Sequence, residues 1–209
     1  MTTEQIYYIY SVNSKNKVTV YHDLASPFSY LGVSQAKKLI SDRGAELILK
    51  PVLLGGIFKA LNGPNVPLFE MNAAKQKYYL TDLQQWANFW GVPLQFSQAF
   101  PLRTVTAQRL LLIKPELTEG LYHAAWGDGI DIGDETWLKA FLLEQGYDAE
   151  KLLTGTQSPQ IKEQLRANTE EALSRGAFGA PSFYLERPHQ EPQLFWGQDR
   201  LQLLSEAMA

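Results

Sequence analysis

The chain has 209 residues, of which 45% are hydrophobic and 20% charged, and its net charge at pH 7 is −3. This length and composition are typical of a globular protein with one domain, or one domain carrying a large insertion. The slightly negative charge does not favour binding to nucleic acid or to an anionic membrane surface. No apolar run is long enough to span a membrane. Cysteine is absent, which excludes disulfide chemistry by the protein's own thiols, and the three histidines, His22, His123 and His189, lie too far apart to favour a metal site.

Residues 1–17 are polar and lack the basic and apolar segments of a signal peptide, so we expect a leader or an added strand on a cytoplasmic protein. The core begins with a predicted buried strand over residues 18–22, where β-branched and aromatic side chains follow one another. Ser26 and Pro27 then predict a helix start, with Ser26 as the N-cap, and the helix extends to about Asp42.

Gly44 ends this helix, and a second strand is predicted over residues 46–52. A strand, a helix and a strand of these lengths form a βαβ unit, so the two strands are expected to be parallel. Gly55-Gly56 and residues 62–67 predict loops, and no convincing strand follows before about residue 175. Helical spacing predicts helices over residues of about 69–90, 103–113, 116–126, 134–145, 148–154 and 159–175.

Gly176 is predicted to adopt the left-handed conformation that ends the preceding helix. Two strands are predicted after it, over residues 181–185 and 193–196. The last predicted element is a helix that starts at residues 197–199. A βαβ half followed by a ββα half predicts an α/β, thioredoxin-like domain, with the intervening helices as an insertion. The expected division is an N-terminal extension at 1–17, a thioredoxin-like domain from 18–56 and 176–209, and a helical insertion at 57–175.

Ser26 stands where an open α/β sheet places its ligand, beyond the carboxyl end of a strand and at a helix N-terminus. The free N–H groups there stabilise an anion such as a thiolate, and the serine hydroxyl can donate a hydrogen bond to it. Because serine cannot exchange disulfides, the position suits the sulfur of a bound ligand. An ordinary helix N-cap explains the same residues.

Two later segments suit a peptide-like ligand. Pro181 follows a glycine-rich turn and directly precedes a strand, which favours a cis bond that leaves the backbone of Ala180 free to pair with an extended ligand. Gln198 and Asp199 open the last helix, where N–H groups suit a carboxylate and Asp199 suits an ammonium. A trans-proline and a plain helix start are the alternatives.

Four spaced motifs stand in the order of one family. They are SPFSYLG at residues 26–32, KPVLLGGIFK at 50–59, GAFGAP at 176–181 and FWGQDR at 195–200. Over residues 18–208 the chain resembles the 2-hydroxychromene-2-carboxylate isomerases and the kappa-class glutathione transferases, within the DsbA-like branch of the thioredoxin fold.

The resemblance implies that glutathione is the cofactor and that Ser26 donates a hydrogen bond to its sulfur. Ala180, before a cis-Pro181, would pair with the cysteinyl backbone. Gln198 and Asp199 would hold the γ-glutamyl end.

The resemblance also implies an asparagine contact after the second strand and a lysine for the glycyl carboxylate. Asn65 fits the first role best, with Asn62 competing because the loop departs from the family pattern. Lys75 fits the second, with Lys77 next.

The resemblance further implies a glutathione-dependent isomerase of aromatic degradation, in which the thiolate adds reversibly to a small hydrophobic or aromatic electrophile. A kappa-like transferase or peroxidase, and a glutathione-binding module without chemistry, are the alternatives, and a homodimer is expected. The second substrate's pocket is expected beneath the insertion. Aromatic side chains that can line it, or belong to the core, are Phe58, Trp86, Phe89 and Trp90.

Overall fold

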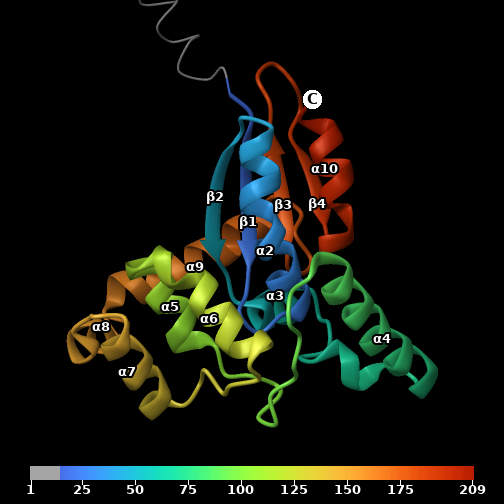
Figure 1. The fold of residues 1–209 in the computed structure, drawn as a ribbon. Helices are drawn as coiled ribbons and strands as arrows, with labels where there is room; N and C mark the ends of the chain where they lie inside the picture. The colour runs from blue at the N-terminus through green and yellow to red at the C-terminus, as the bar shows by residue number, and fades with distance from the viewer. Residues whose placement is uncertain (1–14) are drawn as a thin grey trace, which may run out of the picture.

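The structure, a computed structural model, describes residues 15–209. Four strands form one sheet in the order β2-β1-β3-β4 (Figure 1). Strands β1 and β2 are parallel, and the pairs β1–β3 and β3–β4 are antiparallel, which confirms the predicted α/β order. The strands are β1 (Lys17–His22), β2 (Glu46–Pro51), β3 (Ser182–Glu186) and β4 (Gln193–Trp196).

Helices fill the remainder of the described chain. Around the sheet lie α2 (Pro27–Asp42), α3 (Leu54–Ala60), α9 (Pro159–Ser174) and α10 (Leu201–Ala207). The others are α4 (Ala73–Trp90), α5 (Val105–Ile113), α6 (Thr118–Tyr122), α7 (Glu135–Glu144) and α8 (Ala149–Gly155), with short 3₁₀ turns at 67–70, 115–117 and 198–200.

Helix α2 begins and ends at the predicted residues. Ser26 is its N-cap, and the Ser26 hydroxyl oxygen accepts a hydrogen bond from the backbone N–H of Ser29 at 3.1 Å. Pro27 occupies the first turn, where its missing N–H costs nothing. Gly44 follows the helix with φ +66° and Gly176 follows α9 with φ +86°, both in the left-handed region that favours glycine.

Strand β1 lies at the centre of the sheet and is buried on both faces. Val18 and Val20 belong to the main core with α2, whereas Tyr21 points to the opposite face and packs with residues of α3 and α9. On that face the Tyr21 hydroxyl donates to Glu171 of α9 at 2.7 Å. The continuous apolar run of β1 thus fits a strand that is covered by helices on both sides.

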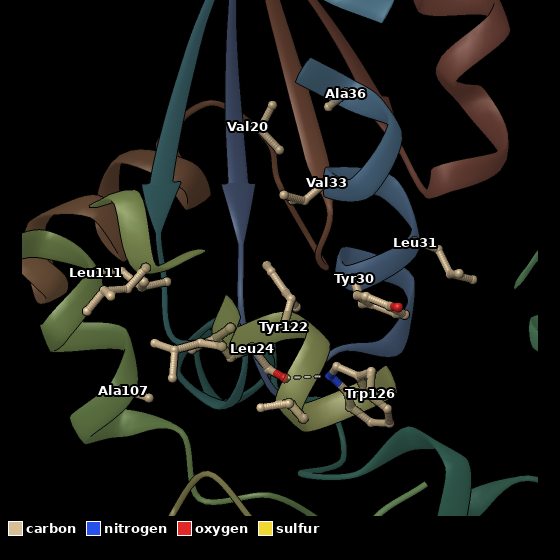
Figure 2. Packing of buried hydrophobic residues seen from close by; sticks show 14 of the residues in the cluster. Val20, Leu24, Tyr30, Leu31, Val33, Ala36, Ala107, Leu111, Tyr122 and Trp126 are labelled. Atoms are coloured by element: carbon tan, nitrogen blue, oxygen red, sulfur yellow. Dashed lines mark hydrogen bonds between the residues drawn. The ribbon is translucent and has the colours of Figure 1, made fainter. Parts of the chain in front are cut away.

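Helices α4 to α8 gather toward the end of the sheet at which β1 and β2 finish (Figure 1). Their core is continuous with that of the sheet, and Trp126, fully buried, joins the two (Figure 2). The predicted helix over 116–126 is observed as α6 followed by a π-helical turn at 123–127. The irregular turn carries Trp126 into contact with Leu24, whose carbonyl oxygen accepts from the indole N–H at 2.8 Å.

The predicted loop at Gly55-Gly56 is wrong, because both glycines lie inside α3. Tertiary contacts override their low helix propensity. The buried carboxylate of Asp23 accepts from the first helical N–H, that of Leu54, at 2.7 Å. A Cβ on Gly56 would lie 3.3 Å from the methyl group of Thr169, so the small residue lets α3 pack closely against α9.

The prediction for residues 1–17 falls mainly on residues 1–14, outside the described residues. Strand β1 begins at Lys17, one residue before the predicted start at residue 18. Lys17 lies opposite Glu46 of β2 and Glu186 of β3. No helix in the described part of the chain is long and apolar enough to cross a membrane.

Candidate functional site

Ser26 lies in the turn between β1 and α2 and is 4% exposed. Its hydroxyl makes two hydrogen bonds, accepting from the Ser29 N–H at 3.1 Å and donating to the carbonyl oxygen of Ala180 at 3.0 Å. The first turn of the 16-residue helix α2 contains no acidic residue, so no carboxylate of the helix itself offsets its N-terminal field. This position therefore suits an anion that accepts a hydrogen bond from the serine hydroxyl.

The peptide bond between Ala180 and Pro181 is cis, as predicted. The Pro181 carbonyl oxygen accepts from the Gly197 N–H at 3.0 Å, which fixes the turn before β3 against the start of the last helical segment. Hydrogen bonds therefore connect the Ser26 turn to the Ala180-Pro181 turn, and that turn to Gly197. The structure brings together three segments that are more than 150 residues apart at their extremes.

A cavity of about 720 Å³ opens beside Ser26 and Ala180. One side is formed by the β1–α2 turn and the start of α3, and the other by the segment at 100–105 that leads into α5. Most of its lining is apolar. The large apolar side chains there are Phe28, Leu53, Leu54, Phe58, Val66, Leu68, Met71, Tyr79, Phe100, Leu102, Val105 and Trp196.

Asp23 is a buried carboxylate that lines the same cavity and is 2% exposed. One oxygen accepts from the Ala25 N–H and the Thr104 hydroxyl, both at 2.9 Å, and the other from the Leu54 N–H at 2.7 Å. Burial raises the pKa of Asp23, while these three hydrogen bonds oppose that rise. Asp23 thus joins the Ser26 turn to the first residues of α3 and to the segment that begins α5.

His22, next to Asp23, supplies no positive charge to the site. Its side chain is fully buried, and burial lowers its pKa to about 3. The ring nitrogen Nδ1 lies 3.0 Å from the Tyr122 hydroxyl. With His22 neutral, the N-terminus of α2 is a source of positive field at Ser26 that does not depend on a charged side chain.

Gln198 and Asp199 open the short 3₁₀ turn that leads into α10, as predicted for the start of the last helix. Gln198 is 4% exposed, and Asp199 forms an ion pair with Arg200 at 2.9 Å. Gly197 has φ +99°, and a Cβ there would lie 2.6 Å from the Asp199 carboxylate. Burial, followed by the negative charge of Asp199, raises the pKa of Asp82 on α4.

The structure separates the alternatives for the asparagine and the lysine. Asn65 lines the cavity, whereas Asn62 is exposed in a left-handed turn and does not line it. Lys75 and Lys77 are both exposed on the first turns of α4, and neither lines the cavity. Within one chain, Asn65 therefore joins Ser26 and Ala180 on the cavity wall, and Lys75 does not. Gln198 and Asp199 do not line this cavity either, but a second groove beside α4.

Of the four aromatic residues expected around a second substrate, only Phe58 lines this cavity. Trp86, Phe89 and Trp90 line a separate groove between α4, the end of α2 and α10, beside Asp199. Phe89 is 77% exposed there. The spacing of these residues places them on one side of α4, but it does not indicate which groove that side borders.

Sequence reasoning missed Asp23, Arg103 and Trp196 as cavity residues. Asp23 carries a signal, since a carboxylate between a buried strand and a helix start demands partners. Arg103 carries none, because its place in the cavity depends on how the insertion packs against the sheet.

The chain is similar throughout to proteins of known kind. The family model described as the DSBA-like thioredoxin domain matches residues 17–209. The 2-hydroxychromene-2-carboxylate isomerase of Sphingobium xenophagum is 30% identical over 197 residues, covering 90% of this chain and 95% of the relative. Glutathione S-transferase kappa 2 of Caenorhabditis elegans is 27% identical, covering 94% of this chain and 93% of the relative.

A solved structure of a 2-hydroxychromene-2-carboxylate isomerase superposes with a TM-score of 0.81 at 27% identity, covering 92% of this chain and 94% of the other. The family model, the relatives and the fold agree over the same residues. The chain belongs to the DsbA-like thioredoxin-domain family.

Proposed function

We propose that this protein is a glutathione-dependent isomerase of the 2-hydroxychromene-2-carboxylate isomerase type. The observation that carries the proposal is the bridge from the Ser26 hydroxyl to the Ala180 carbonyl at the edge of a mostly apolar cavity. It supplies a proton donor at a helix N-terminus, a backbone for a peptide and room for an aromatic partner. The similarity to isomerases and kappa transferases supports the same assignment.

The side chains and backbone at the site fit the tripeptide. When a cysteinyl sulfur lies at the start of α2, the Ser26 hydroxyl turns its proton from the Ala180 oxygen to the sulfur. The Ala180 oxygen is then free to accept from the cysteinyl N–H, so neither group is left unpaired. Asn65 offers a further polar contact in the same cavity, next to the start of α3.

The chemistry itself belongs to the ligand. When bound, glutathione would supply a thiolate as the nucleophile for reversible addition to the double bond of an electrophile. Ser26 and the α2 N-terminus hold this thiolate as an anion at neutral pH. The apolar side chains of the cavity exclude water from the second substrate.

A kappa-like transferase is the second candidate, because a large and mostly apolar cavity also has room for a neutral electrophile. A binding module without chemistry would keep the peptide contacts and lose the thiolate. In each case we propose a homodimer in the cytoplasm, on the resemblance to this family and the lack of an export signal in the sequence. The absence of cysteine from the chain excludes disulfide exchange through its own thiols.

The test is a calorimetric titration with glutathione, in which the ultraviolet absorbance of the thiolate is followed against pH on the same sample. Saturable binding with a bound-thiol pKa below its ordinary value of ~8.5 supports an enzyme. Binding without thiolate formation favours the binding module. Absence of binding at millimolar glutathione contradicts the proposal.

Asp199→Ala is expected to weaken glutathione binding by ~1.5–3 kcal/mol, the usual contribution of a charge-assisted hydrogen bond. Asp199 and the nearby Asp82 together suit the ammonium of the γ-glutamyl group. The dissociation constant is measured by calorimetry. Asp42→Ala removes the same charge from the same groove, where Asp42 pairs with Lys38, and serves as the control. Equal losses in the two variants would contradict a direct contact by Asp199.

A further inference from the structure

The cavity beside Ser26 contains a single cationic side chain among the described residues that line it, that of Arg103. Arg103 is exposed at the cavity wall and forms no ion pair with any carboxylate in residues 15–209. The other charged group on the wall, Asp23, is already satisfied by three donors. The guanidinium therefore has no counterion in the described protein.

The backbone that carries Arg103 is held on both sides. The next residue, Thr104, donates its hydroxyl to Asp23 at 2.9 Å, and the preceding one, Leu102, is 8% exposed. Gly133 packs against the Arg103 carbonyl so closely that a Cβ on the glycine would lie 2.7 Å from the oxygen. Arg103 thus projects from a fixed backbone segment, so a ligand has to order only its side chain and not the loop that carries it.

The surroundings of Arg103 strengthen its attraction for an anion. Phe100 and Leu102 line the cavity just before it and Val105 just after it, so an anion that carries an aromatic ring finds apolar contacts beside the guanidinium. A guanidinium matches a carboxylate with two parallel hydrogen bonds. Ser26 lines the cavity from the β1–α2 turn, and Asn65 lines it from the loop after α3. Arg103 lines it from a different part of the chain, the segment leading into α5.

We propose that Arg103 is a specificity-determining residue that holds an anionic group, a carboxylate, on the second, aromatic substrate. This inference rests on the proposed function, because it assigns the peptide to the Ser26, Ala180 and Asn65 side of the cavity. Arg103 makes the protein selective for aromatic anions over neutral aromatic compounds of the same shape.

The experiment measures binding without any turnover. Calorimetry with the full chain compares trans-cinnamate with trans-cinnamamide, which replaces the carboxylate by a neutral amide. The unsubstituted protein is expected to bind the anion at least tenfold more tightly. In Arg103→Gln that preference falls about tenfold, whereas cinnamamide affinity changes less than twofold. Arg103→Lys keeps the charge but loses the two parallel hydrogen bonds, and retains an intermediate preference.

Arg166→Gln is the matched control, because Arg166 lies on α9, pairs with Glu163 and Glu170, and does not line the cavity. It is expected to leave both affinities unchanged, and circular dichroism verifies that each variant is folded. Equal affinity of the unsubstituted protein for the two compounds, or binding of neither, overturns the inference. So does a loss in Arg103→Gln that falls on glutathione affinity instead, since Arg103 would then hold a carboxylate of the peptide.

The glutathione titration separates this inference from the proposed function. If glutathione does not bind but cinnamate is still preferred through Arg103, the peptide assignment fails and the anion site stands as a property of the cavity. If glutathione binds as a thiolate and the cinnamate preference is absent, the proposed function stands and the role of Arg103 is wrong.

Discussion

Ser26→Ala is expected to raise the pKa of bound glutathione's thiol by about 1 to 2, because one hydrogen bond to a charged group contributes ~1.5–3 kcal/mol and each pKa unit corresponds to ~1.4 kcal/mol. Turnover falls with the thiolate fraction, by roughly ten- to a hundredfold at pH values well below the pKa of the bound thiol and by less near neutral pH, where the unsubstituted protein already holds the thiolate. The pH profile of turnover shifts upward by the same amount. Ultraviolet absorbance of the thiolate against pH measures the pKa directly.

Glutathione affinity changes only a few-fold in this variant, because the serine hydroxyl donates one hydrogen bond in the free protein and one in the complex. The substitution removes both, so their effects on affinity largely cancel. Without the Ser26 hydroxyl, the Ala180 oxygen no longer accepts its proton and is open to the cysteinyl N–H. The variant also loses the cap on the Ser29 N–H, which lowers the free energy of unfolding by ~1 kcal/mol. Assays therefore need a temperature at which every variant is folded.

Ser34→Ala is the matched control, since Ser34 belongs to the same helix and donates its hydroxyl to the Leu31 carbonyl, away from the cavity. Its thiol pKa and turnover are expected to equal those of the unsubstituted protein. If Ser26→Ala leaves both the thiolate absorbance and the turnover unchanged, Ser26 is a helix cap alone and has no part in the chemistry.

The elements that sequence predicts well are those set by neighbouring residues. Ser26 followed by Pro27 determines a helix start whatever lies around it, and Gly44 and Gly176 supply the left-handed conformations that end two helices. A proline between a glycine-rich turn and a strand favours the cis bond that is observed at Pro181, although a trans-proline fits the same local sequence. These signals predict the parallel βαβ unit, the ββα unit and the Ser26 end of the site.

The elements that sequence misses are set by residues far away in the chain. Helix α3 forms through two glycines because Asp23 accepts from its first N–H and Thr169 packs against it. Trp86 has the spacing of a pocket residue, but the packing of α4 assigns it to another groove. Arg103 becomes a cavity residue only once the insertion is placed against the sheet. Such contacts depend on tertiary geometry, which local propensity does not contain.

Trp126→Ala is expected to lower the free energy of unfolding by ~3–5 kcal/mol, the range for truncating a buried aromatic side chain. Trp126 is fully buried and packs edge to face against Phe96 and Phe100. Its indole N–H also satisfies the carbonyl oxygen of Leu24 at 2.8 Å (Figure 2). Chemical denaturation measures the loss. Trp137→Ala, at a half-buried tryptophan of α7 that stacks on Phe141, is the control and loses less.

Trp126→Phe separates the volume from the hydrogen bond. Phenylalanine keeps most of the apolar contact but leaves the buried Leu24 oxygen without its donor, at an expected cost of ~1–3 kcal/mol. Leu24 lies two residues before Ser26, and Phe100 lines the cavity, so the variant loosens both sides of the site although Trp126 itself does not line it. A raised pKa of the bound thiol in a folded Trp126→Phe protein would follow from this. Unchanged stability and unchanged thiol pKa would mean instead that the Leu24 carbonyl finds another donor and that the π-helical turn does not position Ser26.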